Sequence, residues 1–446
     1  MCVRNSRMLK EDQKKQIRSV CRTILSEDAD YGEYSAFLTD RTNLRGRADA
    51  ICFPQSTQEV ADLVRIASRE RIAMVPSGGR TGYAGGAVPD GGIVVSLARM
   101  SKIDYGSGLL HVGAGAITAN IHRRAEQEGM MFPVDFASSG SSFIGGNIAT
   151  NAGGIHVIRY GMIRNWIVSL RVVTGAGQIL DLGANVQKDN TGPDLKHIFI
   201  GSEGIFGIIT EAVLRLTRKP HDTTLGMTGA ASLEEVLGRL QEAKATTDLL
   251  AFECFDRRSA LEVMAHLDLP EPMAISPWYA ILEWEGEAEF PFDLAVAISS
   301  EQKKQFWKYR EGISESLSRH RIYKNDVSIP GGAMPSYVEK IRNLAESLGL
   351  DLAVFGHAGD ENLHINLICR SSMSADEFND RAAQFTVQSY ELIRSYKGSI
   401  SAEHGIGLLK REDFARYGDP ARIELLRSIK KLLDPSGIMN PGKVLI

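Results

Sequence analysis

The sequence predicts an α+β protein with two domains, and three observations support this. The chain has 446 residues, which is more than one hydrophobic core usually organises. In its first half, short apolar runs bounded by glycine and proline alternate with helix-like stretches, as in mixed α and β structure. From about Lys219 onward glycine thins out, and helical patterns alternate with strand-like runs such as YAILEWEG. We therefore expect a domain boundary near Lys219 and Pro220.

The first half contains two expected amphipathic helices, over residues 9–30 and 56–71. In the second helix, Ser56 stands at the N-cap with Glu59 three residues later, which is the capping-box pattern. Short strands are expected over residues 72–75, 92–97 and 109–112. Glycine-rich segments occur again near the C-terminus, in SAEHGIGLLK and DPSGIMNPGKVLI. We therefore expect the C-terminal segment to fold back onto the first domain.

Composition argues against several classes of function. The 51 basic and 55 acidic residues are scattered, so no electrostatic footprint for nucleic acid is visible. The five cysteines are odd in number, far apart and without a C-x-x-C pair, which argues against a disulfide framework and favours a reducing, cytoplasmic location. The N-terminus has no apolar signal region, and no apolar run reaches the ~18 residues of a spanning helix.

Glycine is abundant, with 43 residues, and it gathers in three clusters. The first, PSGGRTGYAGGAVP (76–89), follows an expected strand, so its backbone N–H groups suit a phosphate. The second is SSGSSFIGGNIATNAGG (138–154), and the third, GSEGIFGIITEAVLRL (201–216), precedes an apolar strand that suits a planar ring. One cluster alone is more often a set of tight turns. Three clusters in one domain favour a large phosphate-bearing cofactor.

The segment VGAGAIT (112–118) resembles the start of a dinucleotide fingerprint, with Asp135 downstream. Thr118 occupies the place of the third glycine. We therefore disfavour a nicotinamide-binding Rossmann fold.

Six motifs occur in order from about residue 40 to the C-terminus: PSGGRTGYAGG, FPVDFASSGSSFIGGNIATNAGG, KDNTGPDLKHIFIGSEGIFGIIT, FGHAGDENLHINL, SAEHGIGLLK and NPGKVL. Together they resemble the FAD-dependent 2-hydroxy-acid dehydrogenases of the vanillyl-alcohol-oxidase superfamily. The resemblance implies a PCMH-type FAD-binding domain of two α/β subdomains and a cap domain built on an antiparallel sheet with helices. The implied boundaries are an N-terminal helical segment (1–39), the FAD domain (40–219), the substrate or cap domain (220–400) and a returning C-terminal segment (401–446).

The resemblance also implies the flavin contacts, with the pyrophosphate on residues 78–82. Arg80 stands where these enzymes usually carry Asn. Relatives with covalent flavin carry a histidine in this loop, which is absent here, so FAD is expected to be non-covalent. The expected contacts are Pro76, Gly78, Gly79, Arg80, Thr81, Gly82, Gly85, Gly86, Pro133, Asp135, Ser138, Gly140, Ser141, Gly145, Gly146, Asn147, Thr150, Asn151, Gly153, Gly154, Glu203, Gly204, Gly207, Ile208, Ile209 and Asn440.

Two histidine-containing motifs indicate a metal site. His357 and His364 flank a turn, and SAEHG supplies Glu403 beside His404 on a glycine-flanked bend. Two imidazoles and a carboxylate form a common ligand set for a catalytic divalent metal, although a lone histidine is more often structural. The resemblance places metal ligands at His357, His364 and Glu403, with zinc expected and manganese or iron as alternatives. Relatives usually read H-x-G-D-G-N-x-H, whereas Glu361 replaces the second glycine here, where it could perturb the turn or add a ligand.

The implied chemistry assigns roles to the neighbouring residues. Hydride leaves C2 of a hydroxy acid for flavin N5 only if the C2 hydroxyl loses its proton, which a bound cation makes easier. His404 is the expected base, because imidazole is the side chain that most often takes up a proton in enzymes. Asn366 follows His364 at strand spacing, so both share one face and Asn366 is the expected orienting group.

A cationic pair indicates the substrate. Arg310 and Ser314 lie four residues apart, so on a helix they share a face, and Lys324 follows. Such residues are usually ordinary surface charge. In the D-2-hydroxyglutarate dehydrogenases, however, an Arg, a small hydroxyl residue and a Lys at matching positions hold the distal carboxylate. We therefore expect D-2-hydroxyglutarate, bound by Arg310, Ser314, Lys324, Asn366 and His404, with D-lactate, glycolate or D-malate as alternatives. Asn325 replaces an aromatic residue of those enzymes, which leaves the length of the substrate open.

Two other classes of function compete. A metal-dependent hydrolase or lyase would use the same histidines but would have no use for the glycine clusters. A flavin-binding module without catalysis would keep the clusters but would not need His404 beside Glu403. For the dehydrogenase, the expected electron acceptor is an electron-transfer flavoprotein or a quinone, and a homodimer is left open.

Overall fold

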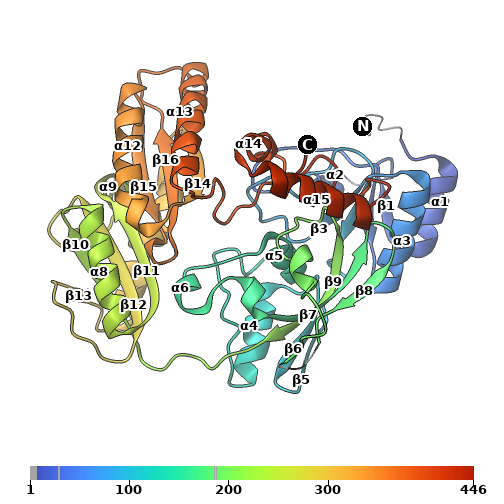
Figure 1. Ribbon diagram of the computed structural model, residues 1–446, viewed down its shortest axis with the longest axis horizontal. Coiled ribbons are helices and arrows are strands. Elements are labelled where there is room, and N and C mark those ends of the chain that lie inside the picture. Colours follow the sequence, from blue (N-terminus) through green and yellow to red (C-terminus); the bar gives the residue numbers. More distant parts are fainter. Residues whose placement is uncertain (1–7, 29–30, 185, 187) are drawn as a thin grey trace. The chain divides into compact units, whose positions relative to one another are not determined.

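The computed structural model describes residues 8–28, 31–184, 186 and 188–446 (Figure 1). The chain forms two compact units, which mix helices and strands and confirm the α+β class. Unit 1 contains residues 1–154, 162–219 and 404–446, and unit 2 contains residues 155–161 and 220–403. The short segment 155–161 thus belongs to unit 2 although both of its flanking segments belong to unit 1, a feature that no sequence pattern indicated.

Unit 1 contains two sheets. The first has the strand order β1-β2-β4-β3, in which β2, β4 and β3 are parallel and β1 is an antiparallel edge strand. The second has the order β5-β6-β9-β7-β8 and is antiparallel throughout. The elements are α1 (Glu11–Val20), β1 (Arg22–Leu25), α2 (Tyr31–Ser35), β2 (Ala50–Phe53), α3 (Thr57–Glu70), β3 (Met74–Ser77), β4 (Ile93–Ser96), β5 (Ile103–Gly106), β6 (Leu109–Gly113), α4 (Thr118–Gln127), α5 (Ile144–Thr150), η1 (Ile163–Trp166), β7 (Ile167–Thr174), β8 (Ile179–Leu182), α7 (Lys196–Phe199), β9 (Gly207–Arg215), α14 (Arg411–Tyr417) and α15 (Pro420–Leu433).

Helix α3 illustrates how sequence sets an element. Ser56 Oγ accepts a hydrogen bond from the backbone N–H of Glu59, as an N-cap does. The Glu59 carboxylate reaches back to the backbone N–H of Gln55 at 2.8 Å, one residue earlier than a capping box predicts. The helix buries apolar residues at a spacing of three and four, namely Val60, Leu63, Val64 and Ala67.

The N-terminal helix is shorter than the sequence predicts. A helix was expected over residues 9–30, but α1 ends at Val20, and β1 pairs with β2 from Arg22 to Leu25. Leu25 is buried and Ile24 packs against the core, so tertiary pairing overrides the helical pattern. Residues 29 and 30 of the expected helix, and the first seven residues of the chain, lie outside the described residues.

The antiparallel second sheet excludes a Rossmann fold, which requires parallel strands joined by helices. Strand β6 leads into VGAGAIT, but its neighbours β5 and β9 both run antiparallel to it. A Cβ on Gly113 would stand 2.1 Å from a carbonyl oxygen of Met100, and one on Gly115 would stand 1.9 Å from that of Leu97. These glycines therefore permit tight packing within the protein.

The C-terminal segment returns to the first sheet of unit 1. The backbone N–H of Met74 donates to Ile438, and that of Asn440 donates to Met74, so this segment runs parallel beside β3. Ile438 and Met439 are buried in the core that both sheets share. Figure 1 shows the red C-terminal helices beside the blue N-terminal elements.

Unit 2 is built on a seven-stranded sheet with the order β13-β10-β12-β11-β15-β16-β14, in which every pairing is antiparallel. Among the described residues, no helix of either unit combines the length and apolar character that crossing a membrane requires. The elements are α6 (Val157–Tyr160), β10 (Thr223–Ala230), α8 (Leu233–Thr246), β11 (Asp248–Asp256), α9 (Arg257–Leu267), β12 (Trp278–Glu285), β13 (Ala295–Val296), α10 (Ser300–Glu311), α11 (Ile313–Leu317), β14 (Ile322–Ser328), η2 (Gly331–Ala333), α12 (Met334–Ser347), β15 (Asp351–Gly356), η3 (Ala358–Asp360), β16 (Asn362–Ile368) and α13 (Ala375–Ser395).

The two faces of the unit 2 sheet are covered by different helices. One face buries Phe255, Tyr279 and Phe355 against residues of α9, α10 and α11. Asn325 points to the other face, where it hydrogen-bonds Tyr390 of α13. Because side chains alternate along a strand, the neighbours of Asn325 in β14, Lys324 and Asp326, lie on the face of α9 to α11.

Candidate active site

A pocket in unit 1 is lined by all three glycine clusters. It opens where β3 ends, beside the first turn of α5 and the start of β9. The lining residues are Asp40, Pro76, Ser77, Gly78, Gly79, Arg80, Thr81, Gly82, Ala84, Gly86, Ala87, Leu97, Phe143, Gly145, Gly146, Asn147, Ala149, Thr150, Ser202, Glu203, Gly204, Gly207, Ile208, Ile209 and His404.

Close backbone approach explains the central glycines of this pocket better than turn geometry does. A Cβ on Gly79 would lie 2.2 Å from the carbonyl oxygen of Ser141, and one on Gly145 would lie 2.6 Å from the Ala114 side chain. Neither glycine has a positive φ. At Gly79 the first two clusters therefore touch through bare backbone, while the backbone N–H of Gly145 donates to the carbonyl oxygen of Ala114.

Arg80 has a left-handed backbone, with φ +57°. Asn tolerates this conformation better than most residues, which accounts for its use in relatives. The Arg80 guanidinium lies 4.3 Å from the centre of the Phe37 ring, and burial lowers its pKa. A cation thus stands at the candidate phosphate-binding loop.

Several expected flavin contacts do not line the pocket: Gly85, Pro133, Asp135, Ser138, Gly140, Ser141, Asn151, Gly153, Gly154 and Asn440. Gly154 instead packs on Asp135, because a Cβ there would lie 1.8 Å from the Asp135 carbonyl oxygen. Asn440 donates from its side chain to the carbonyl groups of Gly86 and Glu203, and so supports the pocket wall. Sequence reasoning missed Asp40, Phe143 and Leu97, which offered no signal beyond their nearness to a motif.

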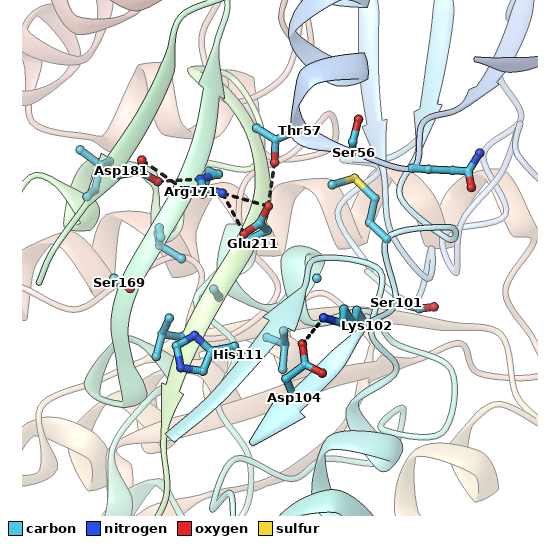
Figure 2. Close-up of a pocket in the computed structure, with 18 of the residues that line it drawn as sticks. Ser56, Thr57, Ser101, Lys102, Asp104, His111, Ser169, Arg171, Asp181 and Glu211 are labelled. Carbon is cyan, nitrogen blue, oxygen red and sulfur yellow. Dashed lines mark hydrogen bonds and ion pairs between the residues drawn. The ribbon is translucent and has the colours of Figure 1, made fainter. Parts of the chain in front are cut away.

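A second cavity in unit 1 lies against β5 to β9, and Figure 2 shows its polar lining. Apart from the exposed Arg99, its charged groups are paired with one another. Arg171 pairs with Asp181 at 2.7 Å and with Glu211 at 3.3 Å, and Lys102 pairs with Asp104 at 2.6 Å. Because these charges are paired, the cavity offers less attraction for a charged ligand than the glycine-lined pocket does.

In unit 2, His357, His364 and Glu403 gather as the sequence motifs predict. One possible ligand atom from each lies within 4.8 Å of the others, and His357 Nε2 is 3.5 Å from Glu403 Oε1. Strand register produces this arrangement, because His364 of β16 pairs with Phe355 of β15 and with Asp326 of β14. His357 follows β15 two residues after Phe355, on the same face.

Each histidine has a carboxylate behind it, which the sequence motifs did not indicate. Glu253, fully buried on β11, accepts a hydrogen bond from His357 Nδ1 at 2.7 Å. Asp326 Oδ1 lies 3.6 Å from His364 Nδ1, and its other oxygen accepts the backbone N–H of Glu403. Carboxylates in this position orient imidazoles for metal binding.

The surroundings of this cluster fit a cation. Asp360 Oδ1 is buried without a hydrogen-bond partner among the described residues. Burial, aided by the charges of Glu253 and Glu403, raises the pKa of Asp360 to about 7. Burial acts to lower the pKa of His357, but the Glu253 charge and hydrogen bond outweigh it and raise that pKa to about 9. Positive charge is therefore favoured at this place.

Glu361, the residue that replaces the second glycine of the motif, makes its contact outside the cluster. Its backbone is left-handed, with φ +68°, which explains the usual glycine. Its carboxylate accepts a hydrogen bond from the backbone N–H of Gly331 at 2.7 Å. It thus fastens the turn to η2, and it is not a member of the three-residue cluster.

The candidate substrate residues differ in their surroundings. Arg310 is buried, and its Nε lies 2.7 Å from Glu253 Oε2 in an ion pair whose angle departs from that of a hydrogen bond. Ser314 is exposed, whereas Arg310, four residues earlier, is buried. Lys324 pairs with Asn366 in the register of β14 and β16, so both lie on the face that carries His364.

Three polar groups here make no hydrogen bond within the described chain: Arg310 Nη2, Lys324 Nζ and the Asn366 side-chain amide. Arg310 and Asn366 are buried, and Lys324 is exposed although desolvation lowers its pKa. Asn325 faces α13, so its departure from the aromatic residue of relatives falls on the opposite side of the sheet.

His404 lines the glycine-rich pocket of unit 1, and its ring centre lies 5.0 Å from that of Tyr83. It directly follows Glu403 of the unit 2 cluster in the sequence. A bare-backbone cofactor pocket with an imidazole at its wall, in a chain that also carries a histidine–carboxylate cluster, defines a flavin-dependent oxidoreductase.

Comparisons with known proteins agree with this class. A family model described as an FAD binding domain matches residues 48–183, and one described as FAD linked oxidases, C-terminal domain, matches residues 219–444. The chain belongs to the family of FAD-linked oxidases.

Curated relatives span most of the chain. It is 40% identical to a D-2-hydroxyglutarate dehydrogenase of Stutzerimonas stutzeri, over 89% of this chain and 90% of the relative. It is 36% identical to the mitochondrial D-2-hydroxyglutarate dehydrogenase of Arabidopsis thaliana, over 90% and 76%. It is 33% identical to a putative mitochondrial D-lactate dehydrogenase of Schizosaccharomyces pombe, over 94% and 86%. The solved 4-ethylphenol oxidase from Gulosibacter chungangensis shares the fold, with a TM-score of 0.73, 16% identity and 98% of both chains covered.

Proposed function

We propose that this enzyme oxidises D-2-hydroxyglutarate to 2-oxoglutarate with FAD as the hydride acceptor and with the help of a divalent metal. The observation that carries this proposal is the set of unpaired donors, Arg310 Nη2, Lys324 Nζ and the Asn366 amide, associated with the sheet face of the histidine cluster. A substrate with two carboxylates and a hydroxyl offers acceptors for all three. The relatives named D-2-hydroxyglutarate dehydrogenase support this choice.

The two cofactors are assigned to different residues. FAD, held without a covalent bond, lies in the glycine-lined pocket, with its pyrophosphate on residues 78–82. His357, His364 and Glu403 hold the metal, for which zinc is the first choice and manganese or iron the alternatives. A bound cation lowers the pKa of the substrate hydroxyl, which eases its deprotonation.

The chain's own residues bind the acid and move its proton. Lys324 and Arg310 pair with the distal carboxylate, and the exposed Ser314 donates a further hydrogen bond to it. Asn366 orients the hydroxy-acid end. His404 takes the hydroxyl proton, because a neutral imidazole near pH 7 is a competent general base.

The alternatives make different demands on these residues. D-lactate and glycolate lack the distal carboxylate, and D-malate places it one carbon closer, so each would leave Lys324 less well satisfied. Membership of the FAD-linked oxidases removes the support for a metal-dependent hydrolase or lyase. The proposal also includes an electron-transfer flavoprotein or a quinone as the electron acceptor and a cytoplasmic location suggested by cysteine usage.

An anaerobic visible spectrum tests the proposal. Purified protein is mixed in turn with D-2-hydroxyglutarate, D-malate, D-lactate and glycolate, with and without a chelator. We expect D-2-hydroxyglutarate to bleach the flavin bands fastest, and we expect chelation to stop the bleaching and added Zn²⁺ to restore it. A flavin that none of the acids reduces would refute the function, and bleaching that survives chelation would refute the role of the metal.

A further inference from the structure

Glu203 is a partly buried carboxylate in the wall of the glycine-lined pocket, where the resemblance implies a flavin contact. Its side chain is instead bound to another part of unit 1. Oε1 accepts the backbone N–H of Ile406 at 2.7 Å, and Oε2 accepts the backbone N–H of Gly407 at 2.8 Å. Both oxygens thus hold the turn that follows His404, and we call these two hydrogen bonds, from Ile406 and Gly407 to Glu203, the clamp.

The backbone of Glu203 is itself firmly held. It is left-handed, with φ +51°, a conformation that a non-glycine residue keeps only when its surroundings impose it. Its N–H donates to the carbonyl oxygen of Ala149 at 2.8 Å, and its carbonyl oxygen accepts from Asn440 Nδ2 at 2.7 Å. Burial raises the pKa of the carboxyl to about 7, although the two N–H groups act to lower it. A carboxylate retained in so unfavourable a place serves to hold the turn.

Two glycines in the turn allow the close contact with Glu203. Gly405 and Gly407 both have positive φ, +79° and +49°. A Cβ on Gly405 would lie 2.8 Å from Glu203 Oε1, and one on Gly407 would lie 2.2 Å from the carbonyl oxygen of Ala84. The backbone N–H of Leu408 donates to that same Ala84 oxygen. The turn is therefore gripped between Glu203 and Ala84.

We infer that Glu203 is a positioning residue that sets the place of His404 at the flavin pocket by binding the turn at Ile406 and Gly407. This inference rests on the proposed role of His404 as the general base. A base works only within hydrogen-bond reach of the proton it takes, and a displacement of ~1 Å can slow a reaction by about 100-fold.

The variant Glu203→Gln removes half of the clamp. A glutamine has the same length, but its single side-chain oxygen satisfies one N–H while its NH₂ group opposes the other. Glu126→Gln is the matched control, because Glu126 is an exposed carboxylate of the same unit that pairs with Lys219 at the surface. His404→Ala reports on the base itself.

The measurement is the rate of anaerobic flavin reduction by D-2-hydroxyglutarate in the FAD-loaded protein, in H₂O and in D₂O. For Glu203→Gln we expect a rate about 100-fold lower, an apparent substrate Kd within about twofold of wild type, and a larger solvent isotope effect, because proton transfer becomes more limiting. Glu126→Gln should match wild type. A merely structural role would leave the isotope effect unchanged.

Each outcome bears on one assignment. If flavin reduction is slow in His404→Ala but has the wild-type rate in Glu203→Gln, the positioning role of Glu203 is overturned and the proposed base stands. If flavin reduction has the wild-type rate in His404→Ala, the proposed base is overturned. If Glu203→Gln loses FAD, Gly405→Ala decides, because its methyl group pushes the turn away from the intact carboxylate. Slow reduction in FAD-loaded Gly405→Ala would support the clamp, and either FAD loss or an unchanged rate there would overturn it.

Discussion

The substitution Glu253→Gln tests whether one buried carboxylate supports both the proposed metal site and the proposed substrate-binding cation Arg310. Glu253 is fully buried, and its two oxygens face His357 Nδ1 and Arg310 Nε, each at 2.7 Å. Those charges lower the pKa of Glu253 in spite of burial, so it is ionised at neutral pH. Glutamine keeps the shape and removes the charge.

The magnitude follows from what the substitution leaves behind. Arg310 is only 7% exposed, and it would stay buried without a counter-charge. Removing one partner of a buried ion pair typically lowers the free energy of unfolding by ~3–5 kcal/mol. Loss of the carboxylate behind a metal-binding histidine typically weakens metal affinity by about 10- to 100-fold. We expect effects in both ranges.

Urea unfolding of the chelated protein measures the first effect, and competition with a chromogenic zinc chelator measures the second. Asp351→Asn is the matched control, because Asp351 also pairs with an arginine, Arg370, at 2.7 Å, but the two side chains are 35% and 44% exposed. Exposed pairs contribute ~0–1 kcal/mol. If Glu253→Gln were no more destabilising than Asp351→Asn, the reasoning about burial would be wrong.

Three further predictions follow from single contacts. Lys324→Ala should raise KM for D-2-hydroxyglutarate by about 10- to 100-fold, the loss of a charged hydrogen bond, and should change KM for D-lactate little; steady-state assays showing equal effects would contradict the dicarboxylate site. Gly79→Ala should prevent FAD binding, because its Cβ would meet the Ser141 carbonyl oxygen, whereas Gly140→Ala, with open space around it, should retain FAD by absorbance at equal protein concentration. Burial lowers the pKa of Lys443 from 10.5 to about 8, so the unfolded chain binds more protons between these values and the free energy of unfolding should rise with pH across them. Lys443→Met should abolish that rise in urea unfolding at pH 8 and pH 10, and an unchanged slope would contradict it.

Much of the site was readable from the sequence because it is encoded in contiguous motifs. The turn between His357 and His364 and the pair Glu403 and His404 are local, and strand alternation places His364 and Asn366 on one face. The glycine clusters were equally readable, because backbone that must approach other backbone tolerates no Cβ.

What the motifs could not specify were partners distant in sequence. Glu253 lies 104 residues before His357 and meets it only because β11 pairs with β15. In the same way, Glu203 lines the glycine-rich pocket as expected, but no motif indicated that its carboxylate binds the turn after His404, where Ile406 lies 203 residues further along the chain.

The sequence by itself determined the α+β class, the glycine clusters that line the unit 1 pocket and the three residues of the histidine–carboxylate cluster, because each depends on local spacing or on the absence of a side chain. Only the tertiary structure decided which carboxylates stand behind the histidines, that Asn325 faces away from Lys324, that segment 155–161 joins unit 2, and that residues 22–25 form a strand instead of a helix. Those outcomes depend on strand register and burial, which arise from contacts between distant segments that no local pattern records.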